Sequence, residues 1–97
     1  MNMYNWVEKM IYGGQKKAFP ILTYPCVQLL NITVRELVAD SSHQAVGMRL
    51  IADRYDMPAA CAYMDLSVEA EAFGANAVYS ADDVPTITGS IINTEEE

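Results

Sequence analysis

One segment, residues 57–74 with the sequence MPAACAYMDLSVEAEAFG, constrains the fold of this chain more than any other. It begins with a short apolar run, residues 59–64, which has the length and the flanking residues of a buried strand. Asp65 follows that run directly, and a helix rich in Ala and Glu is expected from Ser67. In α/β folds, the corner where a strand passes into a helix is where side chains meet ligands. The segment therefore predicts where a site lies, without defining its chemistry.

The composition favours one small domain or a part of a larger one. The chain has 97 residues, and 52% of them are hydrophobic, which excludes disorder for most of its length. The formal net charge is −7, to which Glu95, Glu96 and Glu97 contribute three charges. The six Lys and Arg residues form no basic stripe, which argues against nucleic acid as a partner.

Neither a membrane nor an export pathway is indicated. No uninterrupted apolar run approaches the roughly 18 to 20 residues that a membrane-spanning helix requires. The first ten residues include an acid and amides where a signal peptide would be purely apolar. Cys26 and Cys61 are isolated and lack CxxC spacing, so we expect reduced thiols in a cytoplasmic protein.

Helices and extended pieces are predicted to alternate along the chain. Two four-residue patterns, starting at Thr33 and at Ser41, fit the capping box with which helices begin. Gly74 is expected to end the helix that follows Asp65. The predicted helices span residues 3–13, 42–55 and 67–73, and the predicted extended pieces span residues 19–24, 59–64, 77–79 and 86–92.

This alternation favours a parallel α/β architecture. Two strands cannot form a sheet that buries both of its faces, although parallel sheets need both faces covered. A closed (β/α)₈ TIM barrel takes about 250 residues. We therefore expect residues 1–97 to be the N-terminal part of a barrel domain, with an N-terminal helix and about the first two to three strands.

Three stretches resemble the opening third of the uroporphyrinogen decarboxylase family: FPILTYP at residues 19–25, DMPAACAYMDLSVEAEAFGA at residues 56–75, and DDVP at residues 82–85. The pattern is closest to the branch of corrinoid-dependent methyltransferases, such as methylcobalamin:coenzyme M methyltransferase. The resemblance implies a (β/α)₈ barrel with its site at the C-terminal mouth, and the transfer of a methyl group from a corrinoid to a thiol. Two alternatives stay open, namely a uroporphyrinogen decarboxylase proper and a truncated, non-catalytic fragment that only associates with a partner.

The resemblance also implies site residues. Asp65 falls on the acid that binds pyrrole N–H groups in the decarboxylases, so it is the catalytic candidate, although Asp is also a common helix cap. Tyr24 and Cys26, at the end of the first predicted strand, and Glu69, in the first turn of the following helix, are the candidates for substrate binding. In the decarboxylases, arginines that handle substrate carboxylates follow the first strand. Residues 23–29 read TYPCVQL without an arginine, which weighs against decarboxylation.

The methyltransferase branch uses zinc, held by a His-x-Cys pair and a later Cys, to convert a thiol into a thiolate. These ligands belong to the later part of the barrel, and His43, Cys26 and Cys61 lack the required spacing. We therefore expect no metal site in this chain, and zinc and a corrinoid only in the complete family member. The expected partners are a corrinoid protein or a small-molecule methyl donor, together with self-association or association with the missing barrel portion.

Overall fold

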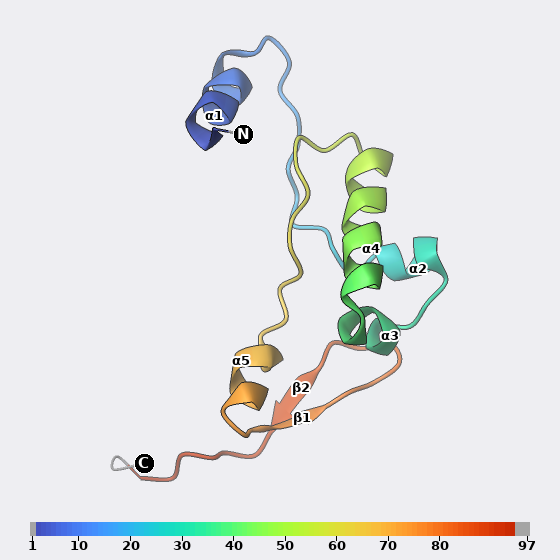
Figure 1. Cartoon of the computed structure of the whole chain (residues 1–97), viewed down its shortest axis with the longest axis vertical. Coiled ribbons are helices and arrows are strands. Elements are labelled where there is room, and N and C mark those ends of the chain that lie inside the picture. The colour runs from blue at the N-terminus through green and yellow to red at the C-terminus, as the bar shows by residue number, and fades with distance from the viewer. Residues whose placement is uncertain (1, 95–97) are drawn as a thin grey trace.

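The computed structural model describes residues 2–94 and shows an elongated molecule in which short helices surround two extended segments (Figure 1). The helices of the described residues agree with the predicted ones to within one or two residues at each end, and two short helices are added between them. The helices are α1 (Met3–Tyr12), α2 (Cys26–Leu30), α3 (Val34–Ala39), α4 (Ser41–Arg54) and α5 (Ser67–Ala72), and the strands are β1 (Asn76–Val78) and β2 (Thr86–Thr88).

One of the two predicted capping boxes is present. The Thr33 hydroxyl accepts the backbone N–H of Glu36 at 3.1 Å, and the Glu36 carboxylate accepts the backbone N–H of Thr33 at 2.8 Å, at the start of α3. The box predicted at Ser41 is wrong. Asp40 caps α4 instead, because its carboxylate lies one residue earlier and accepts the backbone N–H of Ser42 at 2.6 Å.

The two predicted strands, residues 19–24 and 59–64, form extended segments without a strand ladder (Figure 1). Within residues 2–94, no backbone hydrogen bond joins one segment to the other. Side chains hold them together and show that they run in the same direction. The Lys17 ammonium lies 2.7 Å from the Asp56 carboxylate at one end, and the Tyr63 hydroxyl donates to the Thr23 carbonyl at 3.5 Å at the other.

Burial along the second extended segment alternates with the period of a strand. Residues 59, 61, 63 and 65 are half-buried, whereas residues 60, 62, 64 and 66 are exposed. Since successive side chains of extended backbone point to opposite faces, one face of this segment lies against the molecule and the other faces solvent. The sequence pattern therefore predicted the backbone conformation, and the pairing was not realised between these two segments.

The core is small and lies where the helices meet the extended segments. Cys26 of α2, Leu37 of α3 and Ile51 of α4 are fully buried or nearly so, and Tyr24 and Tyr63 pack against them. The core thus connects both extended segments to the layer formed by α2, α3 and α4.

The C-terminal part of the described chain is a helix packed on a two-stranded antiparallel sheet. In this sheet Asn76 pairs with Thr88 and Val78 pairs with Thr86, which places paired strands within two of the predicted extended pieces. Gly74 has a φ of 97° immediately after α5, a left-handed conformation that favours glycine and ends the helix as predicted.

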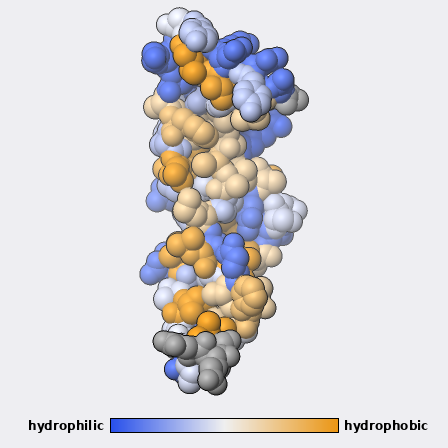
Figure 2. Space-filling model, turned by 90° about the vertical axis from the view of Figure 1, so that its left-hand side faces the viewer, coloured by the Kyte–Doolittle hydropathy of each residue, from blue (hydrophilic) through white to orange (hydrophobic). Residues whose placement is uncertain are grey.

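The molecule leaves an unusually large surface uncovered. Its accessible surface is 7511 Å², whereas a compact monomer of 10.7 kDa would expose about 5,500 Å². Its radius of gyration is 17.5 Å, against about 12.5 Å for a compact chain of this length. Figure 2, which looks onto the side that is on the left in Figure 1, shows apolar surface along most of the length of the molecule.

Helix α1 contributes to this openness because none of its residues is buried. None of the helices within residues 2–94 combines the length and the apolar composition that a membrane span requires.

Candidate functional site

Three of the four candidate residues lie near the carboxyl ends of the two extended segments. Tyr24 and Cys26 follow the first segment, and Asp65 ends the second. Tyr63, which the sequence analysis did not single out, connects them. Its ring lies edge-on to that of Tyr24, with 5.7 Å between the ring centroids and 84° between the planes, and its hydroxyl lies 2.7 Å from the Cys26 sulfur.

The Cys26 thiol belongs to the core rather than to an open surface. The side chain is fully buried and was expected to line the mouth of a barrel. It lies between Tyr63 and Gly47 of α4, where a Cβ atom on Gly47 would come within 2.6 Å of the Cys26 sulfur and 2.8 Å of the Tyr63 hydroxyl. A glycine in the middle of a helix costs about 1 kcal/mol relative to alanine, and this close approach is the reason for it here.

Asp65 caps the start of α5. One of its carboxylate oxygens, Oδ1, accepts the backbone N–H of Ser67 at 2.9 Å and the Ser67 hydroxyl at 2.6 Å. Ser67 is itself almost fully buried. The other oxygen, Oδ2, accepts no hydrogen bond from residues 2–94. Capping and ligand binding therefore use different atoms of the same carboxylate, and the structure is compatible with both roles.

The phenols beside Asp65 stay protonated at neutral pH. Burial raises the pKa of Tyr24, and the negative charge of Asp65 raises it further. Burial and the hydrogen bond with the Cys26 thiol raise the pKa of Tyr63 as well. The Tyr24 hydroxyl is buried and finds no hydrogen-bond partner among the described residues. An unsatisfied buried group of this kind costs about 1–3 kcal/mol, so this end of the segments holds an unpaired donor near a carboxylate.

Glu69 is not joined to the other candidates. It lies exposed in the first turn of α5, where an acidic side chain favours the positive end of the helix dipole. No hydrogen bond or ion pair of the described residues connects it to Tyr24, Cys26 or Asp65. The neighbouring Glu71 instead accepts a hydrogen bond from the Tyr79 hydroxyl at 2.6 Å, which raises the pKa of that phenol.

The zinc implied by the resemblance does not fit the residues of this chain. Within the part that the structure describes, no three His, Cys, Asp or Glu side chains lie close enough to hold a metal ion. His43 lies on α4 and its Nδ1 is 3.4 Å from the Glu36 carbonyl oxygen. No step of a reaction is therefore assigned here to a metal.

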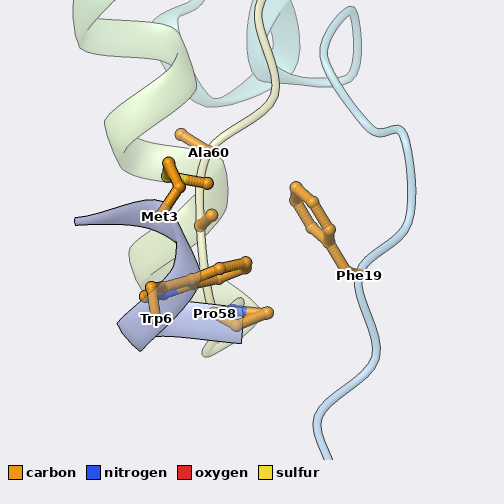
Figure 3. A pocket seen from close by; sticks show the side chains of 6 residues that line it. Met3, Trp6, Phe19, Pro58 and Ala60 are labelled. Carbon is orange, nitrogen blue, oxygen red and sulfur yellow. The ribbon is translucent and has the colours of Figure 1, made fainter. Parts of the chain in front are cut away.

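An apolar pocket of about 460 Å³ lies at the other end of the extended segments, between α1 and the residues where the segments begin (Figure 3). Trp6 of α1 and Phe19 of the first segment face it from different sides (Figure 3). Its lining residues are Met3, Trp6, Phe19, Pro58, Ala59 and Ala60. None of the four candidate residues takes part, so this pocket is separate from the candidate site.

Comparisons of the chain with protein families, with characterised proteins and with solved structures find no match. The resemblance to the uroporphyrinogen decarboxylase family therefore depends on the residue patterns alone.

Proposed function

We propose that this chain is the N-terminal part of a (β/α)₈ barrel enzyme of the uroporphyrinogen decarboxylase type, which transfers a methyl group from a corrinoid to a thiol. The observation that carries the proposal is the pair of extended segments that run in the same direction and end near Tyr24 and Asp65. In barrel enzymes the carboxyl ends of parallel strands carry the residues that bind and react.

The connection between the segments supports a barrel. Helices α2, α3 and α4 lie between them in the chain and pack against one side, as the crossover between two parallel strands does. On the other side, Ala60, Ala62 and Met64 are exposed. In a closed barrel such side chains fill the interior, in layers contributed by alternate strands. The uncovered apolar side is thus what the proposal expects of a barrel whose other strands come from additional polypeptide.

The reaction class is supported by the resemblance of residues 56–75 and 82–85. In this proposal Oδ2 of Asp65 accepts hydrogen bonds from the ligand, since a carboxylate forms strong charge-assisted bonds. The Tyr24 hydroxyl is the matching donor, because it is protonated and unpaired. Zinc bound by a later part of the barrel would supply the thiolate. A cytoplasmic location belongs to the proposal and is supported by the free thiols of Cys26 and Cys61.

One alternative function is favoured by a specific observation. The large uncovered surface is also what a non-catalytic fragment that associates with a partner would show. The two functions differ in activity. Only the first predicts methyl transfer when the chain is joined to the barrel sequence that completes it.

The test is Asp65→Asn in that complete enzyme, assayed by the transfer of the methyl group of methylcobalamin to a thiol. Asparagine keeps an Oδ1 acceptor for Ser67, so the variant removes the charge and leaves the cap. We expect turnover to fall by at least about tenfold, which is about 1.4 kcal/mol in the barrier. Because a cap contributes only about 1 kcal/mol, the melting temperature should change by no more than a few degrees.

Asp53→Asn on the exposed face of α4 is the matched control and should leave turnover unchanged. Full activity of the Asp65 variant would reduce this residue to a helix cap. A complete wild-type enzyme that does not transfer the methyl group would show that the reaction class is wrong.

A further inference from the structure

We propose that the exposed side of the second extended segment is a dimerisation surface, and that its occupant is a second copy of this chain. The surface, here called the apolar stripe, consists of Ala60, Ala62, Met64 and Leu66. This inference depends on the exposed stripe and the uncovered area, and it stands or falls independently of the proposed enzymatic activity.

The apolar stripe exposes both side chains and backbone. Met64 is 57% exposed and Leu66 is 81% exposed, and the two alanines between them and Pro58 are exposed as well. Within the described residues, none of the backbone groups of residues 58–64 takes part in a backbone hydrogen bond. Extended backbone with free N–H and C=O groups and an apolar side is a template for pairing with another chain.

The uncovered area is sufficient for a dimer. The chain exposes about 2,000 Å² more than a compact monomer of its mass. A standard protein interface takes about 800 Å² from each partner, and an obligate dimer takes more. Figure 2 shows that the uncovered apolar surface extends along the side of the molecule that carries the extended segments rather than forming one isolated spot.

The order of side chains in the stripe is self-complementary. In a two-fold dimer the same residues of both copies meet, with the two segments antiparallel. A two-fold axis through Ala62 places the small Ala60 of one copy opposite the larger Met64 of the other. Alternation of small and large side chains across an interface permits close packing.

Charge does not oppose this pairing at its centre, although the net charge is −7. Residues 57–64 contain no charged side chain. At one end Asp56 is paired with Lys17, and at the other the Asp65 carboxylate binds Ser67. With the axis at Ala62, the acidic residues of the two copies lie at opposite ends of the stripe, and physiological salt screens what remains of their repulsion.

The test is sedimentation equilibrium of the whole 97-residue chain over a range of concentrations. We expect a reversible dimer. Ala62→Lys places two ammonium groups at the two-fold axis, so we expect its dissociation constant to rise at least about tenfold. Ala45→Lys, which adds the same charge to an exposed position of α4, is the matched control and should dimerise as the wild type does. Circular dichroism of the three proteins should show the same helix content.

A second variant checks the register. In a Cys61→Ser background, Ala62→Cys should form a disulfide-linked dimer under mild oxidation, and Ala45→Cys in the same background should not. A monomer at every concentration would overturn the proposal, as would equal weakening by Ala62→Lys and Ala45→Lys. Specific cross-linking through position 45 rather than position 62 would show that another surface pairs.

Discussion

The Cys26 sulfur lies 2.7 Å from the hydroxyl oxygen of Tyr63, and this contact joins α2 to the second extended segment. The same hydroxyl lies 3.5 Å from the carbonyl oxygen of Thr23, at the end of the first segment. One phenol thus contacts both sides of the candidate site. Since no backbone ladder connects the two segments within residues 2–94, we expect their relative position to depend on this side chain more than on any other.

Tyr63→Phe should therefore destabilise the chain. The substitution keeps the ring against Tyr24 and removes the hydroxyl, which leaves the Cys26 thiol without its partner. A lost hydrogen bond of this kind costs about 1 kcal/mol, measured as a lower midpoint of urea unfolding. Tyr12→Phe on α1, where the ring is 82% exposed, is the control and should not change the midpoint. Equal midpoints for the wild type and Tyr63→Phe would mean that the thiol–hydroxyl contact contributes nothing.

Gly47→Ala separates packing from helix propensity. An alanine in the middle of α4 would stabilise the helix by about 1 kcal/mol if space allowed. Because its Cβ would meet the Cys26 sulfur at 2.6 Å, we expect the opposite sign, a destabilisation of about 1–3 kcal/mol in urea unfolding. Gly14→Ala, where nothing lies within 4 Å of the new Cβ, should show no such loss. A stabilised Gly47→Ala variant would contradict the close approach of α4 to the second segment.

The local sequence predicted those features that local chemistry determines. The capping box at Thr33 and the helix end at Gly74 depend on residues within one turn, and both are confirmed. The prediction at Ser41 was wrong because Asp40, one residue earlier, supplies a competing carboxylate. Neighbouring residues are enough to explain all three outcomes.

Contacts between distant residues were less accessible. The alternation of residues 59–66 predicted extended backbone correctly, but a ladder needs a partner strand, and no local pattern shows whether one is near. The site prediction brought forward Tyr24 and Asp65 and missed Tyr63, whose role comes from contacts 37 and 40 residues away along the chain. The one available signal was its place two residues before Asp65, on the same face of the segment.

The capping box at α3 gives a prediction about pH. Hydrogen bonds from Thr33 hold the pKa of Glu36 below its ordinary value of 4.5. A lowered folded-state pKa stabilises the chain above the unfolded-state value, and this stabilisation is lost as the pH falls through the folded-state pKa. The wild type should therefore unfold at higher urea than Glu36→Gln at pH 7, and the difference should shrink as the solution is acidified below pH 4.5.

The control for this measurement is Glu8→Gln on α1, whose carboxylate makes no hydrogen bond with the described residues and lies far from the box in sequence. Its difference from the wild type should not follow the same curve. A gap between wild type and Glu36→Gln that persists unchanged at low pH would show that the carboxylate is not part of a capping box.

The central claim, that two extended segments run in the same direction and end together at the candidate site, is tested most directly by nuclear Overhauser contacts in the 97-residue chain. We predict contacts between the rings of Tyr24 and Tyr63 and between Phe19 and residues 58–60. This pattern requires parallel segments. Contacts of Phe19 with Tyr63 in place of these would show antiparallel segments and contradict the account, and the absence of any contact between the segments would contradict it as well.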